Sequence, residues 1–193
     1  RQLDKSDAYA VSKYMELLRR KKEWKKLEYH IGKNKSDPAL RHVVQRESFI
    51  SSLELGKWKR ANKWLYRAKV DHNPYLNLML SRKARFDLDR RAVESGYSDE
   101  ERVRMWWMET PYPGNFGDII NPYIIEGLTG VPPKFTHRNP RLLAVGSIIK
   151  FARKGTSVWG AGCPSWDQVL SPHASYYAVR GPLTRKKVLE CGG

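Results

Sequence analysis

Apolar side chains in the first half of the chain recur every three or four residues, which is the spacing of amphipathic helices. Two blocks share this pattern: Tyr9, Val11, Tyr14, Leu17, Leu18, Trp24, Leu27 and Ile31, and then Phe49, Ile50, Leu53, Leu55, Trp58, Ala61 and Leu65. Each block closes at a proline, Pro38 or Pro74, because the residue before a proline avoids the α conformation. Residues 7–95 are therefore predicted to form helices.

The two blocks are related by a fixed distance along the chain. Similar residues lie 34 positions apart in three cases: Trp24 and Trp58, Leu27 and Ala61, and Ile31 and Leu65. A period near 34 with paired helices resembles that of tetratricopeptide repeats, in which each helix pair buries its inner face by stacking on the next. Gly56 fits the turn between the two helices of such a unit. The alternative is a small helical bundle with a chance periodicity.

The second half of the chain has a different pattern. Short apolar segments there end in glycine, a small residue or a charge, and they cover residues 103–108, 142–149, 157–159 and 176–179. Runs of this kind are typical of the buried strands of a parallel α/β sheet, with the carboxyl ends of the strands open to a ligand. The sequence therefore predicts a parallel sheet of the Rossmann type in this half.

Helices are predicted between and after these strands, over residues 119–128 and 183–190. Residues 81–101 are dense in charge, with Gly96 as a helix breaker, and are predicted to be a last helix followed by a linker. The predicted fold class is thus a helical, repeat-like, basic region over residues 1–98. It is followed by an α/β region over 99–193, the first part of a Rossmann-like domain that is truncated at its C-terminus.

The loop before the first α/β helix contains candidate ligand-binding residues. Gly114 and Gly117 permit tight turns and close approach of a ligand to the backbone, and the N-terminus of the following helix attracts anions. Asn115 and Asp118 either line this site or only cap the helix. The loop has neither the G-x-G-x-x-G pattern nor a P-loop lysine, which argues against a nicotinamide cofactor or ATP, and no cofactor is expected.

Three further loops are predicted at the same edge of the sheet, because the carboxyl ends of parallel strands lie together. Gly146 and Ser147 follow one strand, and Gly160 and Gly162 follow the next. Arg180 follows the last strand and is the best candidate to bind an anion, since a guanidinium pairs with carboxylate or phosphate through two hydrogen bonds. The alternative is that Arg180 forms an ion pair that holds its own turn.

The net charge of +16 is high, with 36 basic against 20 acidic side chains, and both halves of the chain are basic. Such a charge attracts any phosphate: nucleic acid, anionic lipid, phosphorylated metabolites or lipid-linked sugars. Basic runs at 19–22 and 57–63 are either solvated helix faces or sites that dock on an anionic membrane.

Cysteine and histidine usage gives no sign of a metal site. Cys163 and Cys191 are far apart, and the five histidines form no HxxxH pair or cluster with cysteine. No apolar run approaches the roughly 20 residues of a membrane helix. The chain is expected to be reduced and cytoplasmic, with peripheral attachment to the inner membrane as an option. It lacks an initial Met and ends at Gly193, so it is also expected to be part of a longer protein.

Four motifs together resemble the polysaccharide pyruvyl transferase family over residues 103–193. They occur in the family's order: Asn115-Phe-Gly-Asp118, Leu142-Leu-Ala-Val-Gly-Ser147, Val158-Trp-Gly-Ala-Gly162 and Val179-Arg-Gly-Pro-Leu-Thr-Arg185. The resemblance implies a fold similar to GT-B glycosyltransferases, with two Rossmann-like halves. It also implies transfer of a pyruvyl group from phosphoenolpyruvate to two hydroxyls of a sugar, as a ketal, in exopolysaccharide or capsule biosynthesis.

The resemblance also implies roles for individual residues. Arg180 would bind the anionic donor, and Asn115 and Asp118 would lie nearer the acceptor sugar or lipid-linked saccharide. The remaining substrate-binding positions would shape the site through small residues: Gly117, Gly146, Ser147, Gly160 and Gly162. The family's histidine general acid would lie beyond residue 193. Gly181 stands where many relatives carry an acidic residue, which leaves the partner of the arginine open.

Two alternatives remain open at this stage. A GT-B-type glycosyltransferase that uses a nucleotide sugar would need a similar cleft. A basic helical-repeat scaffold, or a nucleic-acid-binding protein, would account for the charge and the 7 Trp and 10 Tyr residues. Nucleic acid is the less favoured partner because the aromatic residues follow the apolar helical stripe and no RNA-binding motif is present.

Overall fold

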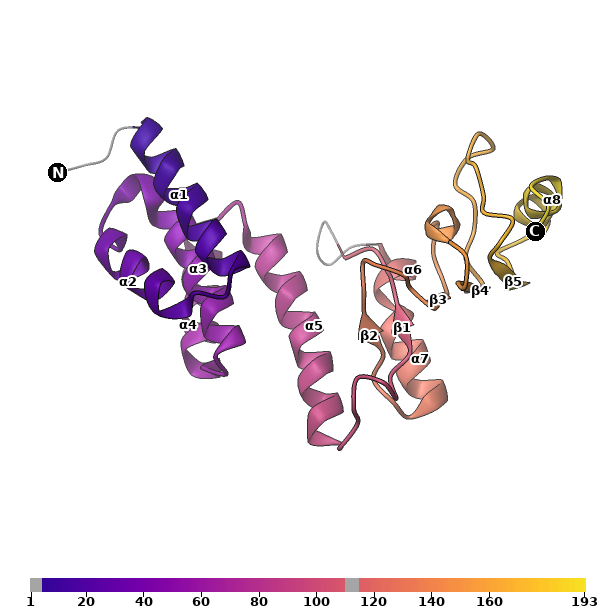
Figure 1. Cartoon of the computed structure of the whole chain (residues 1–193), viewed down its shortest axis with the longest axis horizontal. Helices are drawn as coiled ribbons and strands as arrows, with labels where there is room; N and C mark the ends of the chain where they lie inside the picture. The colour runs from indigo at the N-terminus through magenta and orange to yellow at the C-terminus, as the bar shows by residue number, and fades with distance from the viewer. Residues whose placement is uncertain (1–4, 110–114) are drawn as a thin grey trace. The chain divides into compact units, whose positions relative to one another are not determined.

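The computed structural model describes residues 5–109 and 115–193, with side chains from residue 7 onward in the first range. The chain divides into two compact units, Arg1–Lys83 and Ala84–Gly193. This division falls within helix α5 (Leu76–Glu94), so the helix contributes its first turns to one unit and the remainder to the other (Figure 1). The boundary inferred from composition, at 98/99, follows the helix and stays a prediction.

The first unit is helical, as the spacing of apolar residues predicts. Its elements are α1 (Lys5–Arg20), α2 (Trp24–Asn34), a 3-10 turn η1 (Pro38–Leu40), α3 (Arg41–Glu54), α4 (Trp58–Val70) and the start of α5. Its core contains aliphatic side chains from the first three helices and the turn: Met15, Leu18, Leu27, Ile31, Leu40, Val43 and Val44. Trp24 and Trp64 pack against this core, whereas Trp58 is partly exposed.

The 34-residue spacing of the sequence is also present in the backbone. The turn between α1 and α2 and the turn between α3 and α4 form the same hydrogen bonds: Lys21, Lys22 and Glu23 donate to Leu17, Arg19 and Leu18, and Leu55, Gly56 and Lys57 donate to Ser51, Leu53 and Ser52. Lys22 and Gly56 both have a positive φ, of 57° and 67°. The helices that follow begin at Trp24 and Trp58. The two turns therefore have the same local structure, a helix end with a left-handed residue that also occurs at the ends of α4 and α5.

Helix α3 contributes an ionic cluster to the interior of the first unit. Glu47 is fully buried, and its Oε1 accepts a hydrogen bond from Arg46 Nε at 2.8 Å. Arg19 of α1 places its Nε 2.9 Å from Glu47 Oε2. A buried carboxylate is costly unless it is paired, so these contacts link α1 to α3 through charge as well as through apolar packing.

The second unit contains a five-stranded parallel sheet in the order β2-β1-β3-β4-β5. Its strands are short: β1 (Arg104–Met105), β2 (Lys134–Phe135), β3 (Leu142–Leu143), β4 (Ser157–Trp159) and β5 (Ser175–Ala178). Its helical elements are α6 (Phe116–Ile119), α7 (Asn121–Thr129), a 3-10 turn η2 (Ile149–Phe151) and α8 (Pro182–Glu190). The α/β class predicted from the sequence is therefore compatible with the structure.

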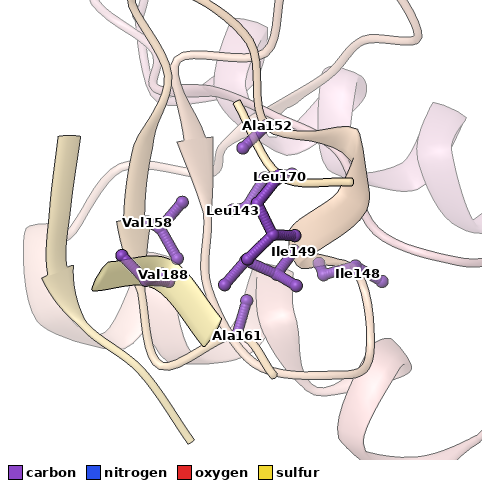
Figure 2. Packing of buried hydrophobic residues seen from close by; sticks show 8 residues of the cluster. All are labelled: Leu143, Ile148, Ile149, Ala152, Val158, Ala161, Leu170 and Val188. Atoms are coloured by element: carbon purple, nitrogen blue, oxygen red, sulfur yellow. The ribbon is translucent and has the colours of Figure 1, made fainter. Parts of the chain in front are cut away.

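Apolar clusters lie on both faces of this sheet. One contains buried side chains from β3, β4, η2, α8 and the loops beside them, which gather together in Figure 2: Leu143, Ile148, Ile149, Ala152, Val158, Ala161, Leu170 and Val188. The other contains Leu88, Met105, Trp107, Ile125 and Ala144. Leu143 and Ala144 are adjacent in the chain and belong to different clusters, as expected where alternate side chains leave opposite faces of a sheet.

The elements of the second unit differ from the sequence prediction in their extent. The segment 142–149 is a strand only at Leu142–Leu143, because the glycine at 146 has a φ of 119° and turns the chain toward η2. The predicted helix 119–128 corresponds to α7, and the short helix α6 before it overlaps the predicted range only at Ile119. Strand β2 was not predicted. Across the described residues, no helix combines the length and apolar character needed to cross a bilayer.

Candidate functional site

The carboxyl edge of the sheet brings together most of the residues singled out in the sequence. All five strands are parallel, but the strand order changes side at β1: the chain adds β2 on one side of β1 and β3 on the other. In open parallel sheets, ligands bind beyond the carboxyl ends of the strands at such a point. The segments that follow β1 and β3 carry Asp118 and Gly146, and these two residues are in contact.

Asp118 lies inside α6 and is buried, with 4% of its surface exposed. Its Oδ1 has no hydrogen-bond partner among the described residues. Burial raises the pKa of the Asp118 carboxyl above its ordinary value, and the positive charge of Arg180 opposes part of this shift. Asp118 lies within α6 rather than before it, so it is not the cap of this helix that the sequence offered as an alternative.

Asn115 provides the cap instead. It precedes α6, and its side-chain oxygen accepts a hydrogen bond from the Gly117 amide at 3.2 Å. Gly117 also lies near Val145, since a Cβ at position 117 would be 3.9 Å from Val145 Cγ1. Asn115 is exposed, and Gly117 forms part of the turn. The contacts of these two residues support a structural role at the start of α6. Gly114, a candidate for the same turn, lies outside the described residues.

Gly146 is required by the position of Asp118. Its φ is 119°, and a Cβ there would overlap Asp118 Oδ1 and lie 3.3 Å from Asp118 Cγ. The same residue accepts a backbone hydrogen bond from Gly162 at 2.8 Å, which extends the pairing of β3 and β4 beyond the strands. The Asp118 carboxyl thus rests against backbone that only glycine can provide.

Arg180 lies over the loop that follows β4. Its Nη1 donates to Ser147 Oγ at 2.9 Å, and its guanidinium covers Gly162, where a Cβ would be 2.7 Å from Arg180 Cζ. The backbone of Arg180 is held by a hydrogen bond to Ala161 at 3.2 Å. Gly160 (φ 100°) donates to Ala178 at 2.9 Å and completes the turn. Among the described residues, the remaining N–H groups of the guanidinium have no hydrogen-bond acceptor.

A residue that the sequence analysis did not select holds the two loops together. Asn121 is fully buried at the start of α7, and its Nδ2 donates to the carbonyls of Val145 at 2.7 Å and Asp118 at 2.8 Å. Its Oδ1 accepts from the Val145 amide at 2.8 Å. The signal in the sequence was an asparagine followed by Pro122 at the start of an apolar helix, which is also the pattern of an ordinary cap.

The described residues around this edge do not include a group of metal ligands. Among residues 5–109 and 115–193, no group of three His, Cys, Asp or Glu side chains could hold a metal ion. His137, a loop histidine, packs edge-on against Phe135 with ring centroids 4.7 Å apart. Within the part of the chain that the structure describes, the site contains the guanidinium of Arg180, the buried carboxyl of Asp118, and hydroxyl and backbone groups around them.

Comparisons of the chain with protein-family models, with curated proteins and with solved structures found no match.

Proposed function

We propose that the unit Ala84–Gly193 is the donor-binding part of a transferase that resembles the polysaccharide pyruvyl transferases. One observation carries the proposal: at the carboxyl edge of a parallel sheet, Arg180 donates to Ser147, and the carboxyl of Asp118 lies against the preceding residue, Gly146. A cation next to a buried carboxyl is a common arrangement at sites that bind an anion and move a proton.

The proposed reaction needs both features. Phosphoenolpyruvate carries a phosphate and a carboxylate, and the guanidinium of Arg180 can hold either of them through two hydrogen bonds. Protonation of the CH₂ carbon activates the adjacent carbon, which forms bonds to two sugar hydroxyl oxygens while its bond to the phosphate oxygen breaks. One hydroxyl proton replaces the proton that the CH₂ carbon takes up, the other leaves with the solvent or phosphate, and the products are the ketal and inorganic phosphate.

The finer features of the fold belong to the same proposal. The parallel sheet would be the first of two Rossmann-like halves of a GT-B-like enzyme, and the helical unit would be a tetratricopeptide-like extension. The general acid would then be a histidine of the second half, beyond residue 193. In the unit described here, Asp118 would position the acceptor hydroxyls, and Ser147 would hold the guanidinium in place.

The test is a binding measurement followed by an assay of turnover. Calorimetric titration of the chain with phosphoenolpyruvate is expected to give saturable binding, and Arg180→Ala should weaken it by about 10- to 100-fold through the lost charge-assisted hydrogen bonds. Arg185→Ala is the matched control, because Arg185 is an exposed arginine of α8. With a panel of sugars, acceptor-dependent phosphate release and a pyruvyl ketal in the mass spectrum would support the reaction.

If the chain bound a nucleotide sugar and did not bind phosphoenolpyruvate, the proposed reaction would be glycosyl transfer and not pyruvyl transfer. Equal loss of binding in Arg180→Ala and Arg185→Ala would contradict the assignment of Arg180 and leave only a general effect of charge. Binding of neither ligand to the wild-type chain would overturn the proposal for this unit.

A further inference from the structure

More than half of the basic side chains of the first unit lie in two segments, each of which contains one helix. Residues 21–35, which include α2, contain six basic and two acidic side chains, and residues 57–71, which include α4, contain six basic and one acidic. These two segments carry net charges of +4 and +5, more than half of the +16 of the whole chain. The positive charge is therefore concentrated in two segments, and these two segments occupy corresponding positions in the 34-residue repeat.

The repeat copies individual basic positions as well as apolar ones. Four basic positions of the first segment recur 34 residues later in the second: Lys25 and Lys59, Lys26 and Arg60, Lys33 and Arg67, and Lys35 and Lys69. Helices α2 and α4 begin at the equivalent residues Trp24 and Trp58 after the same type of turn, so the repeated basic residues occupy equivalent positions along the two segments. The basic positions are thus a regular feature of the outer surface rather than a chance cluster.

Two ion pairs place α2 and α4 next to each other. Glu28 Oε1 of α2 lies 3.1 Å from Lys57 Nζ and 2.9 Å from Arg60 Nη1, at the beginning of α4. Within the described residues, Lys25, Lys33, Lys59, Lys63 and Lys69 are exposed and form no ion pair. We call the exposed surface of α2 and α4 that bears these five lysines the basic outer face.

Large side chains with apolar surface stand among these lysines. On α4, Lys59, Lys63, Tyr66 and Val70 follow helical spacing opposite the buried Ala61 and Ala68, and Tyr66 and Val70 are 70% and 56% exposed. On α2, Tyr29 is 65% exposed and lies one turn from Lys25. Lysines around exposed tyrosine and aliphatic side chains are the composition of helices that lie on the surface of a bilayer.

We infer that the basic outer face docks on an anionic lipid surface. The free cations of this face are lysines, whose ammonium groups act as point charges suited to a diffuse layer of headgroups. The two arginines, which would best recognise individual phosphates of a nucleic acid, are already engaged. Arg60 pairs with Glu28, and Arg67 lies over the Trp64 ring at 4.9 Å. The inference is independent of the proposed transferase activity.

Vesicle sedimentation tests the inference on the whole chain. Binding is expected to vesicles that contain phosphatidylglycerol and not to phosphatidylcholine alone, and to decrease as salt rises from about 0.1 M to about 1 M, because the Debye length falls to about 3 Å. Replacement of Lys25, Lys33, Lys59 and Lys63 by glutamine together should weaken binding at least about 100-fold, since each lysine near an anionic surface contributes roughly a 5-fold factor.

A second fourfold variant is the matched control. Lys150, Lys154, Lys186 and Lys187 lie in the other unit, and their replacement by glutamine removes the same charge, with an expected change below about threefold. Circular dichroism melting of both variants establishes that they fold. Equal loss in the two variants, or no binding of the wild-type chain at about 0.15 M salt, would overturn the inference. So would tighter binding to a single-stranded oligonucleotide that depends on the same four lysines.

Discussion

The side-chain amide of Asn121 forms both hydrogen bonds with the backbone of Val145 that a neighbouring β-strand would form. Its Nδ2 donates to the Val145 carbonyl at 2.7 Å and its Oδ1 accepts from the Val145 amide at 2.8 Å. Val145 lies two residues after the end of β3, where the chain leaves the strand to reach Gly146 and Ser147. One buried side chain therefore continues the hydrogen bonding of the sheet at the edge where the candidate site lies.

Asn121→Ala is expected to lower the free energy of unfolding by about 3 kcal/mol, because it leaves the buried amide and carbonyl of Val145 without partners. Hydrogen exchange at the Val145 amide should accelerate in the same variant. Equilibrium unfolding in urea and amide exchange measure the two effects. Glu190→Ala, an exposed position near the end of α8, should change the free energy by less than about 0.5 kcal/mol. An unchanged stability in Asn121→Ala would contradict the structural role.

Gly162→Ala and Gly146→Ala are expected to have different effects on the stability of the chain. At position 162 the new methyl meets only the end of the flexible Arg180 side chain, so stability should change by less than about 1 kcal/mol while the Arg180–Ser147 hydrogen bond is lost. At position 146 the φ of 119° and the contact with Asp118 should cost more than about 2 kcal/mol. Thermal melting separates the variants, and similar losses in both would refute the distinction.

The pH dependence of stability should report the buried carboxyl of Asp118. Its pKa is raised by burial in the folded chain, so the unfolded chain ionises first as the pH rises above about 4, and stability falls over that range. Asp118→Asn removes this titration. The variant should therefore gain stability relative to the wild type between about pH 4 and pH 7.

Asp167 provides a control for which the expected change of stability with pH has the opposite sign. A hydrogen bond from Ser165 lowers the pKa of this exposed carboxyl, so Asp167→Asn should lose stability relative to the wild type as the pH rises from acid to neutral. Urea unfolding at several pH values measures both variants. The same slope for both would show that the burial of Asp118 does not control its titration.

The two equivalent turns of the helical unit predict a reciprocal pair of substitutions. Lys22 and Gly56 occupy the same left-handed position, which a lysine adopts at a cost and a glycine does not. Lys22→Gly should stabilise the chain by about 1 kcal/mol, and Gly56→Ala, with open space around its Cβ, should destabilise it by a similar amount. Differential scanning calorimetry compares the two shifts, and shifts of the same sign would contradict the equivalence of the turns.

Local patterns were sufficient to predict much of this chain. The spacing of apolar residues predicted helices over residues 7–95, and the run at 157–159 predicted strand β4 with the bounds that it has. The glycines and Arg180 were predicted to lie at one edge because parallel strands align their carboxyl ends, and Gly146, Gly162 and Arg180 are indeed in contact with one another or with Asp118.

What the sequence could not indicate depended on contacts between distant residues. Asn121 meets Val145 across 24 positions, and its local sequence is that of a cap. Glu47 is charged, so its place in the helical pattern gave no sign that Arg19 and Arg46 would bury it. Strand β2 has two residues after two prolines, and only its pairing with β1 defines it.

The 34-residue spacing of the helical unit has a consequence for how such a surface can grow. Each segment brings its own turn and the same four basic positions, in or directly after α2 in one segment and in α4 in the other. A tandem duplication of one segment would therefore add cations in proportion to length, without any redesign of the interior. The affinity for an anionic surface would then rise with each added segment. Gain or loss of a whole segment would change this affinity without altering the fold of the other segments.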